Sequence, residues 1–132
     1  MPDFLFVLAR LGVYASGLWL IAVAALMAFA PHTALRGLAA MGSTPSIHFG
    51  EHALRGLAGL ALVGASEASR FPSVFLIFGL FLVLSSILII VAPRRWHHAY
   101  ANFWAQRLPA WLIRLLSLLT AASGLALIWA AG

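Results

Sequence analysis

The chain has 132 residues, of which 64% are hydrophobic and only 8% are charged, and its formal net charge is +5. Soluble domains carry about 25% charged residues, so this composition predicts an integral membrane protein and excludes an ordinary soluble fold. All eight basic residues are arginines dispersed among apolar runs, which argues against a nucleic-acid-binding surface. The sequence has no cysteine, which excludes disulfides and thiolate-bound metals.

The first half of the chain predicts two membrane spans. An apolar run over about 4–30 is long enough to cross a bilayer, and we expect it to be retained rather than cleaved as a signal peptide. Residues 31–46 are expected to be a connector with a short amphipathic turn on the membrane surface. Thr44 and Pro45 suit the N-cap and first position of a helix, so a second span is predicted over about 45–67.

The second half predicts two further spans, over about 72–92 and 110–131, joined by an interfacial amphipathic helix over about 93–109. Aromatic side chains in that helix recur at helical spacing on one face, as in helices that lie at headgroup depth. We expect contacts with lipid headgroups from Arg94, Arg95, Trp96, Tyr100, Trp104 and Arg107. In the last span, Ala122, Ala126 and Ala130 predict a smooth stripe for helix packing.

The expected fold is therefore all-α: an integral membrane four-helix bundle forming one transmembrane domain over 1–132, with the interfacial helix between spans three and four. The distribution of arginine sets the expected orientation in a bacterial inner (plasma) membrane. The connectors 1–2 and 3–4 carry most of the arginines, so the positive-inside rule predicts that both lie in the cytoplasm and both termini on the periplasmic side.

The second span contains a polar stripe formed by His48, Glu51, His52 and Arg55. These residues fall within roughly 100° of one another on a helix that turns about 100° per residue. With a rise of about 1.5 Å per residue, Arg55 lies roughly 15 Å below the start of the span. Ionisable groups at membrane depth are expensive, so this stripe is the main candidate for a binding or structural site.

Two interpretations of the stripe follow from its spacing. Glu51 and Arg55 stand at i and i+4 with the acid first, the favourable order for a helical ion pair. In the structural interpretation this pair neutralises itself and holds the neighbouring helices in register. In the functional interpretation the stripe forms a polar pocket that binds an anion or lipid headgroup or relays protons, as in a small transporter.

Histidine provides a third interpretation. His48, Glu51 and His52 match the H-x-x-E-H pattern, in which two histidines one turn apart bind zinc and the glutamate activates water. A zinc site needs a third ligand, and the remaining carboxylates, Asp3 and Glu67, are expected at the opposite side of the membrane. All five histidines are expected on the cytoplasmic side, so the candidate ligands of a metal ion or haem are His32, His48, His52, His97 and His98. We predict no catalytic residue and no cofactor, with metal or haem as the alternative.

Two sequence elements resemble known families. The pattern Glu51-x3-Arg-Gly-x2-Gly-x4-Gly64 is similar to the second helix of small four-helix bacterial membrane families, including DoxX-like proteins and families of unknown function. The Pro-Arg-Arg-Trp element that begins at Pro93 resembles other short inner-membrane proteins. This resemblance implies the architecture and no activity. Small multidrug exporters carry their membrane carboxylate in the first helix, whereas here it lies in the second, beside Arg55, which argues against drug–proton antiport.

The sequence therefore predicts a non-enzymatic accessory or structural subunit of a membrane complex, or a self-associating bundle. Its expected partners are membrane lipids and other membrane-protein subunits or further copies of itself, and not nucleic acid. A small transporter or an anion- or lipid-binding protein is the second hypothesis, and a haem or metal membrane protein is the third.

Overall fold

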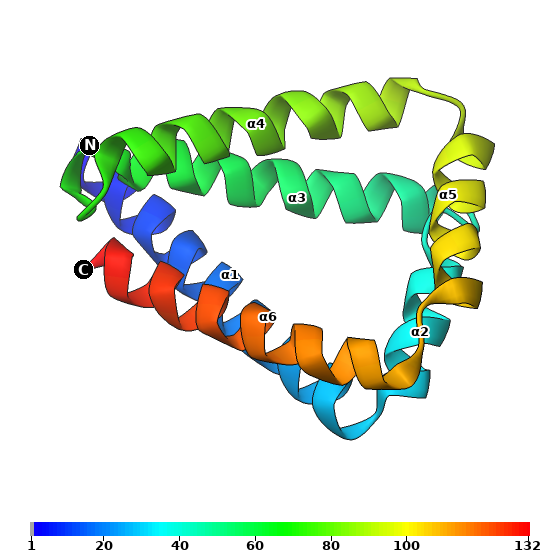
Figure 1. The fold of residues 1–132 in the computed structure, drawn as a ribbon. Coiled ribbons are helices and arrows are strands. Elements are labelled where there is room, and N and C mark those ends of the chain that lie inside the picture. Colours follow the sequence, from blue (N-terminus) through cyan, green and yellow to red (C-terminus); the bar gives the residue numbers. More distant parts are fainter. Residues whose placement is uncertain (1) are drawn as a thin grey trace.

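The computed structural model describes residues 2–132, and these residues are almost entirely helical (Figure 1). No strand occurs among them, which confirms the predicted all-α class. The elements in chain order are α1 (Pro2–Phe29), α2 (Pro31–Ala40), α3 (Pro45–Ala65), the 3-10 turn η1 (Ser66–Ala68), α4 (Pro72–Val91), α5 (Arg94–Arg107) and α6 (Ala110–Ala131).

Most predicted helix limits agree with the structure to within two residues, and two details differ. The connector after the first span is the ten-residue helix α2 rather than a short turn. Its first residue is Pro31, which suits a helix start because proline has no N–H group to leave unpaired. The helix predicted as the second span, α3, ends at Ala65, and the chain then tightens into η1.

The long helices form two antiparallel pairs (Figure 1). One pair is α3 with α4, and the other is α1 with α6. The two pairs meet at the end where both termini lie, and they diverge toward the opposite end, where α2 and α5 lie across the bundle. Helix α1 also packs against α3, so α3 is flanked by helices of both pairs.

Three helices, α1, α4 and α6, are long and apolar enough to cross a membrane. Their outward faces carry large exposed apolar side chains such as Leu5, Trp19, Ile77, Leu84, Leu88, Leu118 and Leu119. An apolar surface of this extent suits lipid rather than water as the surrounding solvent. Helix α3 is not among these three, because the histidines, Glu51 and Arg55 make it more polar.

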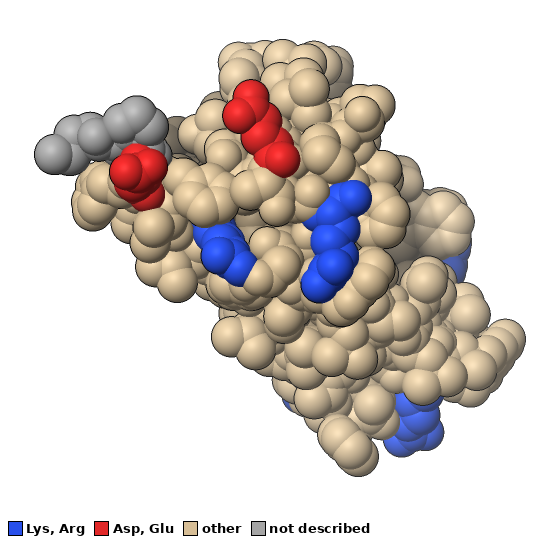
Figure 2. Space-filling view, turned by 90° about the vertical axis from the view of Figure 1, so that its left-hand side faces the viewer, with Lys and Arg blue, Asp and Glu red and all other residues tan. Residues whose placement is uncertain are grey.

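Charged side chains of both signs lie on the terminal end of the molecule, where they are separated by uncharged surface (Figure 2). Arg70, between η1 and α4, ties this end to α6. Its backbone N–H donates to the Ala130 carbonyl over 2.9 Å, and its Nε donates to the Trp129 carbonyl over 3.0 Å. Basic side chains commonly satisfy the free carbonyls at a helix C-terminus in this way.

Within each pair the helix backbones approach closely at glycines. A Cβ added to Gly59 of α3 would lie 2.7 Å from the Gly79 carbonyl oxygen of α4. A Cβ added to Gly17 of α1 would lie 2.9 Å from the Gly124 carbonyl oxygen of α6. Small residues permit this packing in membrane helices.

Of the predicted alanine stripe on the last span, Ala130 is buried, whereas Ala122 and Ala126 are exposed. Gly124, opposite Gly17, provides the close backbone contact with α1.

Candidate metal centre

The start of α3 determines which side chains of this helix point inward. The Thr44 hydroxyl accepts a hydrogen bond from the Ile47 N–H over 3.1 Å, and Pro45 is the first helical residue. This confirms the predicted cap and begins the helix at Pro45. His48 and His52 then follow one turn apart on the same face, and they are buried, with 6% and 4% of their surfaces exposed.

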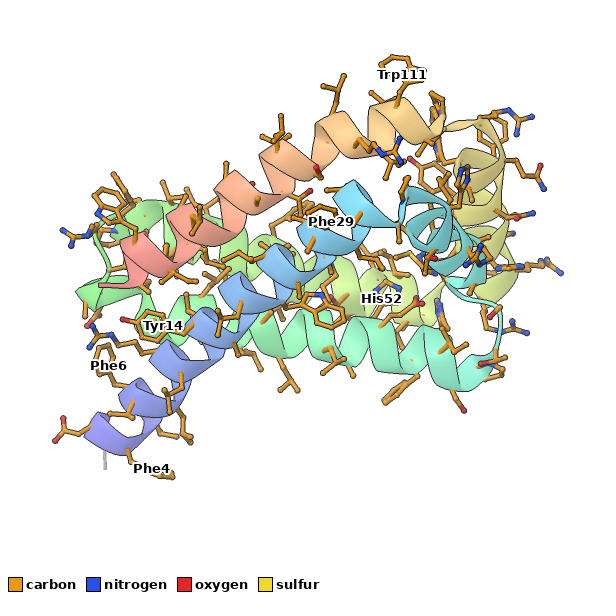
Figure 3. All side chains as sticks on the ribbon, turned by 90° about the horizontal axis from the view of Figure 1, so that it is seen from below. Phe4, Phe6, Tyr14, Phe29, His52 and Trp111 are labelled. Carbon is orange, nitrogen blue, oxygen red and sulfur yellow. The ribbon has the colours of Figure 1, made fainter. Side chains whose placement is uncertain are left out.

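The structure brings a third histidine, His97 of α5, against these two. Its Nδ1 lies 3.3 Å from the Nδ1 of His48, and the ring centroids of His97 and His52 are 4.8 Å apart. One nitrogen from each of the three rings lies within 4.8 Å of the others. We call His48, His52 and His97 the histidine triad. Figure 3 shows His52 on α3, toward the end of the molecule where α2 and α5 lie.

The loop between α2 and α3 holds α5 in the position that places His97. Arg94 at the start of α5 donates from Nη1 to the carbonyls of Gly42 (2.9 Å) and Ser43 (2.8 Å). Gly42 has a φ of +69°, and a Cβ there would lie 2.9 Å from His97 Nδ1. Only glycine combines this backbone conformation with so close an approach.

The other two histidines do not join the triad. His98 is directed to the same loop, with its Nδ1 2.9 Å from the Met41 carbonyl oxygen. His32 is exposed on α2. Of the six residues expected to contact headgroups, Arg94 is half-buried and bonded to the loop instead. The other five are exposed on α5: Arg95, Trp96, Tyr100, Trp104 and Arg107.

Hydrogen bonding leaves a nitrogen of His48 available for a metal ion. His48 Nε2 lies 3.2 Å from the carbonyl oxygen of Ile89 in the last turn of α4. That carbonyl has no partner within its helix, because the residue four positions on is Pro93, which lacks an N–H. His48 therefore donates from Nε2, and its Nδ1 lone pair faces His97. Histidines that bind metal commonly donate their second nitrogen to a backbone carbonyl.

Burial lowers the pKa of His97, although the nearby Glu51 carboxylate opposes this shift. The neutral imidazole, which is the form that binds metal, is therefore favoured. In that form His97 donates its proton from Nδ1 to His48 Nδ1. A metal ion held between the two rings would have to replace this proton.

Buried polar atoms without a hydrogen-bond partner concentrate around the triad. Six such side-chain atoms occur in the described residues 2–132, and five of them lie on α3 and α4: Glu51 Oε2, both ring nitrogens of His52, Arg55 Nε and Ser86 Oγ. A buried polar group left without a partner costs about 1–3 kcal/mol. In native proteins such groups are almost always satisfied by protein, water or an ion. The unpartnered polar atoms of α3 and α4 therefore gather around Glu51, His52 and Arg55.

The predicted ion pair between Glu51 and Arg55 does not form. Arg55 donates from Nη2 to the Ser85 hydroxyl over 2.9 Å, and its guanidinium lies 5.9 Å from the centre of the Phe81 ring. Within residues 2–132, the contact of Glu51 that the structure shows is with His97, at 4.0 Å between Oε2 and Nδ1, and it is an ion pair only when His97 is protonated. The helical spacing of α3 shows neither of these contacts, because they involve side chains of α4 and α5.

The separation of His48 and His97 suits a small metal ion. Two nitrogens bound at about 2.0–2.1 Å to a tetrahedral zinc ion are about 3.3 Å apart. The Nδ1 atoms of His48 and His97 have this separation, 3.3 Å. Imidazole ligands suit zinc, copper, iron and nickel. Haem fits less well, because the three rings already touch, with centroids 4.8–5.3 Å apart, and leave no space for a porphyrin between two of them.

No protein-family model, no curated protein and no solved structure matches this chain. The resemblance to DoxX-like proteins stays a prediction, and the function must be argued from the site.

Proposed function

We propose that this chain is a four-span bacterial inner-membrane protein that binds one transition-metal dication of the Zn²⁺ class at the histidine triad. The proposal rests on the surroundings of His52. It is only 4% exposed, neither of its ring nitrogens has a hydrogen-bond partner, and a ring nitrogen of each of two further imidazoles lies within 4.8 Å of one of its own. An ion bound there gives His52 a partner and uses the lone pair that His48 presents.

In this proposal α3 also crosses the membrane, in addition to α1, α4 and α6. This helix has 21 residues, a length of about 31 Å at 1.5 Å per residue, against a hydrocarbon thickness of about 30 Å. It lies between α4 and α1, two helices that are apolar enough to cross a membrane. Its buried histidines face into the bundle, which is the usual position of polar groups in membrane helices.

The orientation follows from the arginines. The end formed by α2 and α5 carries Arg36, Arg94, Arg95 and Arg107, whereas the terminal end has Arg10 and Arg70 accompanied by Asp3 and Glu67. The positive-inside rule then puts the triad at the cytoplasmic end, where it takes its ion from the cytoplasm, and both termini in the periplasm.

The absence of cysteine in the sequence allows a clean test of this topology. Ala68→Cys in η1 and Gln106→Cys in α5 replace exposed residues at the two ends. A membrane-impermeant maleimide added to spheroplasts should label the Ala68→Cys protein fully. It should label the Gln106→Cys protein only after the membrane is opened. Labelling of both variants from the same side would contradict the four-span topology.

Titration with Zn²⁺ tests the metal site. The purified full chain in detergent, stripped with a chelator and dialysed, should bind one equivalent of Zn²⁺ in isothermal calorimetry. We expect a micromolar or tighter dissociation constant, equivalent to about −8 kcal/mol or better. A titration with no heat beyond dilution, or one that needs several equivalents, would contradict the proposal.

In this account the protein is non-catalytic, with an accessory or structural role in the membrane and contacts with lipid and with other subunits or copies of itself. The transport hypothesis would be supported by a surface hollow lined by the polar stripe, and the two hollows described next are not lined by it. One hollow is lined by Val63, Glu67 and Pro72 near the terminal end, and another by His32, Arg36 and Gln106 over α2 and α5. Neither hollow is lined by a residue of the polar stripe.

A further inference from the structure

Glu51 lies beside the triad, and one of its carboxylate oxygens has no hydrogen-bond partner. It precedes His52 on α3 and stands three residues after His48. Its Oε2 is buried without a hydrogen-bond partner, and lies 4.0 Å from His97 Nδ1, the same nitrogen that faces His48. The oxygen therefore lies near the His97 nitrogen that faces His48.

We propose that Glu51 is the fourth metal ligand, so that His48, Glu51, His52 and His97 form a closed four-coordinate site that fastens α5 to α3. This inference rests on the metal binding proposed above and adds the role of the ion. Structural zinc sites have four protein ligands, whereas catalytic sites keep one position for water.

One pair of ligand atoms already has the required separation, and the others need to move closer. Zinc binds carboxylate oxygen at about 2.0–2.2 Å and imidazole nitrogen at about 2.0–2.1 Å, so neighbouring ligand atoms are roughly 3.4 Å apart. The Nδ1 atoms of His48 and His97 are already that close, at 3.3 Å. The 4.0 Å between Glu51 Oε2 and His97 Nδ1 exceeds the expected separation by less than an ångström. The triad nitrogens lie within 4.8 Å of one another, so the His52 ring and the Glu51 side chain have to move inward for all four to bind.

Charge also favours direct ligation. A dication held only by neutral imidazoles leaves two positive charges in a largely buried site, beside the Arg55 guanidinium, and buried charge is costly without a counter-ion. A Glu51 carboxylate bound to the ion cancels one of these charges. Arg55 does not compete for this carboxylate, because its guanidinium is bonded to Ser85 on α4.

The arrangement gives the ion a mechanical role. Three of the four ligands belong to α3, and the fourth belongs to α5, which is already attached to the loop before α3 through Arg94 and Gly42. A bound ion adds a link between the two helices where α4 ends and α5 begins. The H-x-x-E-H interpretation requires the opposite, with Glu51 off the metal and water in the fourth position.

Cobalt substitution distinguishes a closed from an open site, because the visible spectrum of Co²⁺ reports its coordination. The full chain loaded with Co²⁺ should show the strong bands of a tetrahedral ion, and added azide should not change them. In Glu51→Gln, which keeps the side-chain size, the affinity for Co²⁺ should fall at least 10–100-fold, the range found when even an outer-shell partner is lost. Azide should now shift the spectrum of the variant, because a solvent position has opened.

Two further variants separate ligation from general effects on the fold. Glu51→His restores a donor atom and should recover a tetrahedral spectrum that azide does not change. Glu67→Gln removes a carboxylate from η1 at the other end of the molecule and should behave as the unmodified chain.

Two results would overturn this inference while leaving metal binding intact. One is a shift of the unmodified protein's Co²⁺ spectrum on adding azide. The other is a Glu51→Gln protein with unchanged affinity and spectrum. Failure of the unmodified protein to bind Co²⁺ or Zn²⁺ at all would overturn the proposed function itself.

Discussion

Replacing His52 with alanine should lower the affinity for Zn²⁺ by about 100-fold or more, since the loss of a direct ligand exceeds the 10–100-fold cost of losing an outer-shell partner. The metal-free variant should be about as stable as the unmodified chain, because the imidazole that is removed has two buried nitrogens without partners. The affinity is measured by calorimetry and the stability by thermal unfolding in detergent, with and without metal.

His32→Ala is the matched control, because it removes an exposed imidazole on α2 outside the triad. At a free Zn²⁺ concentration 100 times the dissociation constant, binding stabilises a folded protein by about 2.7 kcal/mol. We expect the unmodified chain and the His32 variant to gain this stabilisation, and the His52 variant to lose nearly all of it. Equal gains in all three proteins would show that any bound zinc lies elsewhere.

Gly59→Val should produce the largest loss of fold stability among single substitutions in α3. A Cβ at this position would lie 2.7 Å from the Gly79 carbonyl oxygen and 2.9 Å from Leu82 Cβ and Val83 Cγ2. The backbone of α4 would have to move to relieve these contacts. Overpacking of this kind typically costs 1–3 kcal/mol, and we expect about 3 kcal/mol here because a backbone atom is involved.

Gly50→Val is the control for helix propensity, since Gly50 is in the same helix and its added Cβ would meet no atom within 4 Å. Thermal unfolding in detergent, followed by circular dichroism, should show a clearly lower transition temperature for the Gly59 variant only. A similar change in both variants would mean that α3 and α4 do not pack through Gly59 and Gly79.

The helices were largely predictable because their signals are local. Apolar runs of about twenty residues define the long elements, and Pro45 and Pro72 mark two of the helix starts. Helix α2 was expected only as a turn, because ten residues with Gly37 near the middle give a weak periodic pattern. The mutual packing of the helices was harder to predict. The alanine stripe of the last span looked suitable, yet Gly124 makes the contact because it offers no side chain at all.

The site was only half predictable. His48, Glu51 and His52 share a helix face, which the sequence shows directly, whereas His97 lies 45 residues beyond His52 on an element whose direction depends on Arg94 and Gly42. His97 was one of five candidate histidines, and nothing in the sequence distinguishes it from His32 or His98. Glu51 was paired with Arg55 because helical spacing shows only partners on the same helix.

The central claim is most directly tested by X-ray absorption at the zinc edge on the full chain loaded with one equivalent of Zn²⁺. We expect four nitrogen or oxygen ligands at about 2.0–2.2 Å from the zinc ion, with the outer-shell scattering of three imidazole rings. A first shell of oxygen atoms without imidazole scattering would contradict the histidine triad as the metal centre.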